Sequence, residues 1–164
     1  MVKEKVLDFA NKVSKKKRGA KDAIKPEDPE YRILEPVVTD EMAEVALGLE
    51  FRIPQSAQEV AAKCGKSIEE TSRILDELAD LGVCFVNKKD GVDKYWHDTW
   101  IPGIMECMVN KIENVRKFPQ IAEAMEALSG VVSGGATDLG DVFGFSLDLV
   151  HGAAQPAVLY VGDG

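Results

Sequence analysis

This chain of 164 residues lacks any long run of apolar residues and contains three cysteines in all. A helix that crosses a bilayer needs about 20 consecutive apolar residues, so no membrane-spanning segment is expected. The opening residues Met1–Lys5 are charged and lack the apolar stretch of a secretory signal. The cysteines, Cys64, Cys84 and Cys107, are odd in number and widely spaced, which argues against a disulfide framework. Isolated thiols are typical of a reducing compartment, so the sequence predicts a cytoplasmic protein.

Basic residues outnumber acidic ones only in the N-terminal part of the chain, residues 1–35. The net charge is −8, with 20 Lys and Arg against 28 Asp and Glu, and residues 129–164 contain no Lys or Arg. Affinity for nucleic acid comes mainly from neutralising phosphates, so an acidic chain disfavours a nucleic-acid partner. The one basic cluster is Lys15–Arg18. It is either a contact for nucleic acid or an acidic partner, or the solvated end of a short helix.

Charge, glycine and proline divide the chain into four expected segments. Residues 1–36 form a basic N-terminal helix, packed loosely, followed by a linker punctuated by Gly19, Pro26, Pro29 and Pro36. Residues 37–101 form the main folded domain, and residues 102–130 form a C-terminal helical pair. Residues 131–164 are a Gly-rich tail that is either disordered or the remnant of a truncated module.

Capping signals place three helices in the main domain. Thr39 is expected to cap the first helix, and Ser56–Glu59 is a capping box that opens a second, short helix ending at Gly65. A second capping box, Ser67–Glu70, opens a third helix that ends at Gly82. The apolar stripe expected on this third helix consists of Ile68, Thr71, Leu75 and Leu78.

A β-hairpin is expected directly after the third helix. The β-forming runs Val83–Val86 and Lys94–His97 flank a turn that contains the Asp90-Gly91 signal. Three helices with a short turn between the second and third, followed by a hairpin, are the pattern of a winged helix-turn-helix. The sequence therefore predicts a mainly α protein built on a winged helix with flanking helices.

The C-terminal pair is expected to consist of two amphipathic helices. Pro102 stands where a first helical turn tolerates proline, and helical spacing then continues to Lys117. Pro119 restarts the pattern, which reaches Leu128. A homodimer through residues 102–128 is one expectation for these apolar stripes.

The third helix argues against a DNA-binding role. A recognition helix presents donors to bases and phosphates, whereas this one has five carboxylates, among them Glu69, Asp76 and Glu77, against the single guanidinium of Arg73. Like charges brought close to phosphates cost about 1 kcal/mol per pair even at high dielectric. We expect Arg73 to form a local ion pair, and the acidic helix suits a basic protein partner.

The hairpin leaves an alternative open. Lys88, Lys89 and Lys94 are candidates for phosphate contacts, although aspartates between them dilute the charge. Together with Arg73, these lysines carry the alternative hypothesis of a winged-helix transcriptional regulator that binds DNA.

The aromatic residues Trp96 and Trp100 have two interpretations. They form either a hot spot for a partner protein or part of the core between the hairpin and the next helix. The histidines, His97 and His151, have no Cys, His or carboxylate at zinc-binding spacing, and no phosphate-binding loop occurs. No catalytic set of nucleophile, base and orienting group can be assembled, so neither an enzyme nor a metal site is expected.

Several packing and capping motifs carry a resemblance to a known family. They are Glu35–Thr39, Ile53-Pro54, Ser56–Ala61, Leu78–Gly82, Trp100–Glu106 and Phe118–Ala122. With them, residues 31–128 resemble the N-terminal winged-helix region of 4Fe-4S ferredoxin-like proteins of bacteria and archaea. In that family, cysteine-rich cluster motifs follow the winged helix, whereas this chain has no cysteine after Cys107.

The resemblance implies an association with iron–sulfur redox proteins. No cluster ligand can be carried over, so this chain is expected to bind no cofactor, the 4Fe-4S cluster belonging to a downstream module that it lacks. The function predicted is a non-catalytic protein-interaction module that docks a basic or iron–sulfur protein. The surface residues expected to serve it are Trp96, Trp100, Glu69, Asp76 and Glu77.

Overall fold

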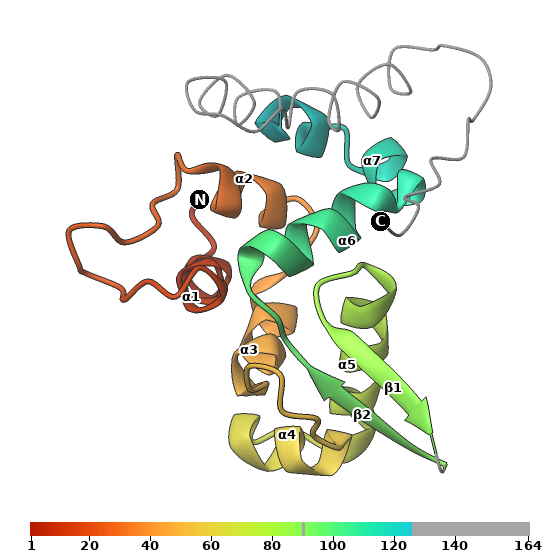
Figure 1. Ribbon diagram of the computed structural model, residues 1–164. Helices are drawn as coiled ribbons and strands as arrows, with labels where there is room; N and C mark the ends of the chain where they lie inside the picture. The colour runs from red at the N-terminus through yellow and green to blue at the C-terminus, as the bar shows by residue number, and fades with distance from the viewer. Residues whose placement is uncertain (90, 126–164) are drawn as a thin grey trace, which may run out of the picture.

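The computed structural model describes residues 1–89 and 91–125, and the mainly α class is confirmed (Figure 1). Its helices are α1 (Glu4–Val13), α2 (Pro29–Leu34), α3 (Asp40–Gly48), α4 (Ala57–Cys64), α5 (Ile68–Asp80), α6 (Met105–Asn110) and α7 (Ile112–Lys117). The strands β1 (Phe85–Lys89) and β2 (Val92–Trp96) form an antiparallel hairpin, and an irregular turn, η1 (Trp100–Ile104), leads into α6. Residues 120–125 are also helical. The predicted tail 131–164, the turn residue Asp90 and the predicted helix end at Leu128 lie outside the described residues.

The predicted caps of α3 and α4 are confirmed. Thr39 Oγ1 accepts a hydrogen bond from the Met42 amide at 3.2 Å, and Ser56 and Glu59 form the reciprocal capping box of α4. Gly65 ends α4 with a φ of 67°, a conformation that costs other residues free energy.

Only half of the second capping box forms. Ser67 Oγ accepts from the Glu70 amide at 3.2 Å, but the Glu70 carboxylate lies 3.0 Å from Lys66 Nζ instead of returning to the helix start. The predicted stripe also differs at its first member, because Ile68 is 53% exposed while Thr71, Leu75 and Leu78 are buried. Ile68 is the first residue of α5, where the side chain lies beyond the edge of the core.

The N-terminal segment belongs to the core, which corrects the expectation of a loosely packed helix. Val6, Phe9 and Val13 are buried on the side of α1 that packs against α3. Lys12 Nζ donates to the carbonyls of Leu47 and Leu49, each at 2.6 Å, and so caps the C-terminal end of α3. The expected linker 18–36 contains α2, and one hydrophobic cluster extends from α1 to residue 125.

A short extended segment between α3 and α4 joins the hairpin, which the sequence did not reveal. Gln55 forms an antiparallel bridge with Tyr95, with N–O distances of 2.9 and 2.7 Å, and Phe51 bridges to His97. Arg52 turns the segment with a φ of 56°. The hairpin itself begins at Phe85, two residues later than predicted, because Val83 packs in the core below α5.

The predicted helix from Pro102 to Lys117 begins later than expected and is broken once. Pro102 has a non-helical ψ of 141°, so α6 begins only at Met105, and Lys111 breaks the helix with a ψ of 97°. The break has a tertiary cause: Lys111 Nζ donates to the carbonyls of Ala79 and Asp80, and so caps the end of α5. Contacts with α5 thus override the helical periodicity.

Gly82 holds the end of α5 against α6. Its φ is 78°, and a Cβ placed there would lie 2.8 Å from the Cys107 carbonyl carbon and 2.9 Å from its oxygen. Glycine is therefore required twice, for its conformation and for the close approach of two backbones.

Candidate acidic docking face

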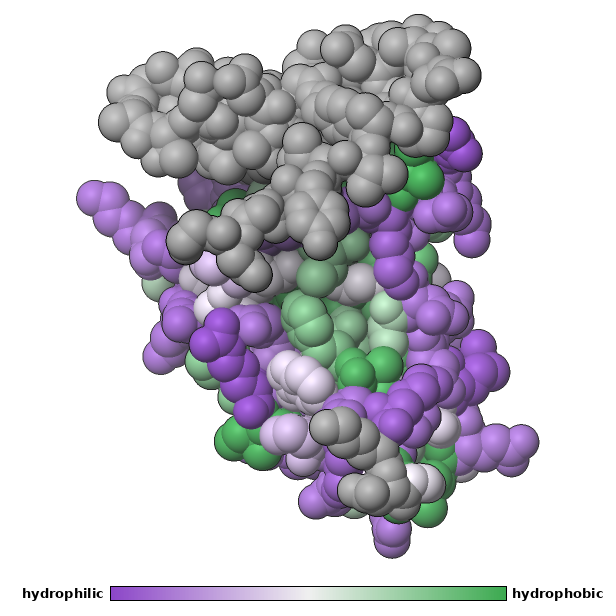
Figure 2. Space-filling view, turned by 45° about the vertical axis from the view of Figure 1, so that its right-hand side comes forward, coloured by the Kyte–Doolittle hydropathy of each residue, from purple (hydrophilic) through white to green (hydrophobic). Residues whose placement is uncertain are grey.

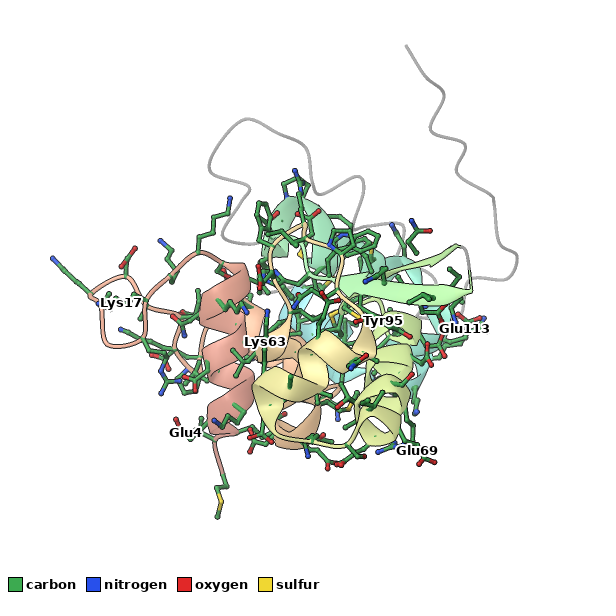
Figure 3. The ribbon with its side chains drawn as sticks, turned by 90° about the horizontal axis from the view of Figure 1, so that it is seen from below. Glu4, Lys17, Lys63, Glu69, Tyr95 and Glu113 are labelled. Atoms are coloured by element: carbon green, nitrogen blue, oxygen red, sulfur yellow. The ribbon has the colours of Figure 1, made fainter. Side chains whose placement is uncertain are left out.

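Helix α5 presents its carboxylates to solvent while its apolar side faces the core. Ile74, Leu75 and Leu78 are buried, and the exposed or half-exposed polar residues of α5 are Glu69, Glu70, Ser72, Arg73, Asp76, Glu77 and Asp80. Figure 3 shows Glu69 at the outer end of the helix. We use the name acidic face for the outward residues of α5 together with those of the β1–β2 hairpin.

The single arginine of α5 is paired within its own helix, as the spacing predicts. Arg73 Nη1 lies 3.5 Å from Glu77 Oε2, one turn later, and both side chains are more than half exposed. An exposed pair of this kind contributes less than about 1 kcal/mol to stability. Its consequence here is electrostatic: the one guanidinium on the helix is already beside a carboxylate.

The hairpin lysines are also drawn to carboxylates. Lys88 Nζ lies 3.3 Å from Asp93 and 3.5 Å from Asp76, and hydrogen bonding to Asp93 with the nearby charge of Asp76 raises the pKa of Lys88. Lys94 Nζ lies 3.2 Å from Glu59 Oε2. Lys89 occupies the last position of β1, opposite Val92, and its side chain is outside the described part.

Glu59 shows how strongly this region stabilises an ionised carboxyl group. Hydrogen bonds from the Ser56 amide and hydroxyl, with a further one from Lys94, lower the pKa of Glu59 to about 2. The Lys94 ammonium is thereby held next to a permanent negative charge.

Tyr95 ties the hairpin to α5, a role that the sequence reading missed. Its hydroxyl donates to Asp76 Oδ1 at 2.9 Å, and burial together with this bond raises the pKa of Tyr95. Figure 3 shows Tyr95 where the hairpin meets α4 and α5. Asp76, a predicted partner-binding residue, therefore also has a positioning role.

The two tryptophans do not form one surface. Trp96 is half-buried on the hairpin and stacks on Phe85 with ring centroids 6.0 Å apart and an interplanar angle of 16°. Trp100 is 3% exposed and lies in the core, which corresponds to the packing interpretation and removes it from any docking surface. Its indole Nε1 has no hydrogen-bond partner within residues 1–89 and 91–125.

A groove of about 400 Å³ opens where α4, α5 and the hairpin meet. The N-terminal parts of α4 and α5, with the cap residue Ser56, contribute Ser56, Gln58, Ile68 and Ser72, and the hairpin contributes Val92 and Tyr95. Ile68 and Val92 are each 53% exposed. Periodicity had assigned Ile68 to the core, so the exposed pair was not foreseen.

The basic N-terminal cluster lies away from the acidic face. Figure 3 shows Lys17 and Glu69 on opposite sides of the molecule. Arg18 lies 2.9 Å from Glu4 and 3.4 Å from Asp8 of α1, and Lys16 lies 2.8 Å from Asp22. The cluster therefore supplies no cationic strip to α5.

Figure 2 shows hydrophobic residues gathered in the middle of a mostly hydrophilic face. Within the described ranges, no helix is long and apolar enough to cross a membrane.

The apolar stripes that were expected to form a homodimer pack inside the chain, since Ile104, Met105 and Met108 are buried. The homodimer through residues 102–128 stays a prediction.

The cysteines show no metal-binding geometry. Among residues 1–89 and 91–125, no three His, Cys, Asp or Glu side chains are grouped to hold a metal ion. Burial raises the pKa of the Cys84 thiol to about 12, which leaves it protonated and unreactive at neutral pH. That this chain carries no cluster stays a prediction.

No protein-family model matches the chain, and no curated protein matches it.

Proposed function

We propose that this chain is a winged-helix protein-interaction module, without catalytic activity, that docks a basic partner on its acidic face. The helix order α3, α4, α5 followed by a hairpin supports the winged-helix assignment. The bridge between Gln55 and Tyr95 fixes the segment between α3 and α4 to the hairpin.

The observation that carries this proposal is the arrangement of charge. On the acidic face, each cation whose side chain the structure describes has a carboxylate within 3.5 Å; these cations are Arg73, Lys88 and Lys94. The sequence of α5 and the hairpin, residues 68–80 and 85–96, holds seven Asp and Glu against four Lys and Arg, so the face keeps an excess of negative charge. Such a surface attracts Lys- and Arg-rich proteins and repels phosphates.

The resemblance of residues 31–128 to ferredoxin-like proteins supports an iron–sulfur redox protein as the partner, in the cytoplasm. In this proposal the 4Fe-4S cluster resides in the partner or in a separate module. An iron and sulfide assay with a visible spectrum tests this point. We expect a colourless protein, and a bound cluster would contradict it.

The proposed function is tested by affinity capture from the native lysate at low salt. The bait is the wild-type chain, and the matched control is the double variant Glu69→Lys/Glu77→Lys. We expect a partner that wild type captures and the variant does not. Equal capture by both baits, or none by wild type, would contradict docking through α5.

The competing DNA-binding hypothesis has its own discriminating result. A protein that neutralises six phosphates loses roughly a thousandfold in affinity between about 50 and 200 mM salt. We expect no binding of random duplex DNA at low salt. A salt-sensitive complex that weakens in Arg73→Ala and Lys88→Ala would support the regulator instead.

A further inference from the structure

The groove at the junction of α4, α5 and the hairpin combines exposed aliphatic side chains with surrounding carboxylates. Ile68 and Val92 come from different elements and line the same groove, and each exposes about half of its surface. Single exposed aliphatic residues are ordinary on protein surfaces. Two that line one hollow of about 400 Å³ offer a partner side chain apolar contact on both sides.

Carboxylates lie around this groove. Asp93 lines it, Asp76 accepts a hydrogen bond from the hydroxyl of Tyr95, another lining residue, and Glu69 follows the lining residue Ile68 in α5. The hairpin cations with described side chains are paired with carboxylates, Lys94 with Glu59 and Lys88 with Asp93 and Asp76. An incoming aliphatic side chain flanked by cations therefore meets apolar surface in the groove and negative charge beside it.

We propose that this groove binds an aliphatic side chain from a Lys- and Arg-rich segment of the partner protein, an inference that rests on the proposed function. Charge complementarity selects this occupant. The chain's own residues 129–164 are excluded on the same ground, because they contain acidic residues and no Lys or Arg. The basic cluster of a second copy is a poorer match, since Arg18 is held by Glu4 and Asp8.

A second exposed apolar site provides the matched control. Phe51 is 40% exposed and Ile53 is 53% exposed, on the loop between α3 and α4. Lys15 Nζ lies 4.8 Å and Arg52 Cζ 5.1 Å from the centre of the Phe51 ring. The cations on this site repel a basic segment, so we expect no binding there. Replacing Phe51 and Ile53 therefore shows whether the loss of any exposed apolar side chain weakens binding, or only the loss of those in the groove.

The experiment measures binding of fluorescein-labelled synthetic peptides to the full chain by fluorescence anisotropy. One peptide alternates leucine with lysine and arginine, the second has serine in place of leucine, and the third has glutamate in place of the cations. The protein variants are Ile68→Ser/Val92→Ser for the groove, Phe51→Ser/Ile53→Ser as the control and Glu69→Lys/Glu77→Lys for the charge. Circular dichroism confirms that each variant is folded.

We expect the leucine-containing basic peptide to bind wild type most tightly and the acidic peptide not to bind. Burying the exposed half of an aliphatic side chain is worth about fivefold in affinity, so the groove variant should bind the leucine peptide about 25-fold more weakly. The control variant should stay within about twofold of wild type. The serine peptide should not distinguish the groove variant from wild type.

Two failures are distinguishable. If the groove variant binds the leucine peptide as wild type does, while the charge variant loses it, the groove inference is wrong and docking on the acidic face survives. If wild type binds neither basic peptide, both the inference and the proposed function are contradicted.

Discussion

Two faces of this molecule expose aliphatic or aromatic side chains to a similar extent but surround them with different charge. On the acidic face, Ile68 and Val92 stand among carboxylates that outnumber the cations. On the Phe51 face, which we define as Phe51, Ile53, Lys15 and Arg52, the cations lie on the aromatic ring itself. Judged only by the exposure of their apolar side chains, the two faces would be equally good candidates for a docking site.

The difference shows what makes an exposed apolar residue informative. Arg52 is satisfied locally, with its guanidinium 3.0 Å from Asp98, and Phe51 packs on His97 at 6.1 Å between ring centroids. On the Phe51 face, the charged and aromatic side chains therefore already have partners within the chain. The acidic face leaves negative charge and apolar surface together, which is why we propose that a partner docks on that face.

The largest expected effect comes from breaking the attachment of the acidic face to the rest of the fold. Gly82→Ala adds a Cβ 2.8 Å from the Cys107 backbone at a positive φ, so it should lower the free energy of unfolding by about 3 kcal/mol. Gly91→Ala is the matched control, because its φ is 73° but nothing lies within 4 Å of the added Cβ. It should cost about 1 kcal/mol. Urea denaturation measures both, and equal losses would contradict the close approach of α5 and α6.

The corresponding change beneath the Phe51 face is Lys12→Ala. It removes two charge-assisted hydrogen bonds to the carbonyls of Leu47 and Leu49 and should cost about 2 kcal/mol of stability. Lys17→Ala, an exposed lysine of the same region, should cost almost nothing. Binding of the basic peptide should be unchanged in the folded Lys12 variant. A loss of peptide affinity would show that the two faces are coupled.

The reactivity of the Cys84 thiol, which lies under α5, tests how firmly the acidic face is packed on the core. Cys84 is buried with its pKa raised by burial to about 12, whereas Cys64 and Cys107 are half-buried. Iodoacetamide should label Cys64 and Cys107 first, and Cys84 only when the protein unfolds. Mass spectrometry of the labelled peptides measures the order, and early labelling of Cys84 would mean that the face is not anchored as described.

The smallest expected effect is the titration of Glu59 at the edge of the acidic face. Because its pKa is lowered to about 2, chiefly by hydrogen bonds from Ser56, its stabilising contribution is present above the ordinary carboxyl pKa. That contribution is lost as the pH falls through about 2. Ser56→Ala removes the hydroxyl bond but keeps the bond from the Ser56 amide, and Lys94→Ala removes the ammonium, so each change alone should raise the Glu59 pKa only in part, as measured by NMR of the carboxyl carbon. A return to the ordinary carboxyl pKa in either variant would contradict the leading role of the backbone amide.

The sequence predicted what local interactions decide. Thr39, Ser56 and Gly65 cap helices through contacts with residues a few positions away in the sequence. The start of α3 and both ends of α4 could therefore be predicted from the sequence pattern alone. The ion pair of Arg73 with Glu77 was accessible for the same reason.

Features created by distant contacts were not accessible. Gln55 joins the hairpin through Tyr95, forty positions later, and Lys111 breaks a helical pattern to cap α5. Helical spacing assigned Ile68 to the core because it cannot reveal that the first residue of α5 lies at a groove. Trp100 was ambiguous in sequence, and only its burial separates core packing from a hot spot.

The central claim, that the acidic face attracts cationic protein and repels nucleic acid, is tested most directly by one competition measurement. The leucine-containing basic peptide and a random DNA duplex are titrated against the same wild-type protein at about 50 mM salt. We expect the peptide to bind, with affinity lost in Glu69→Lys/Glu77→Lys, and the duplex not to bind. Duplex binding that depends on Arg73 and Lys88, with no binding of the peptide, would contradict the account.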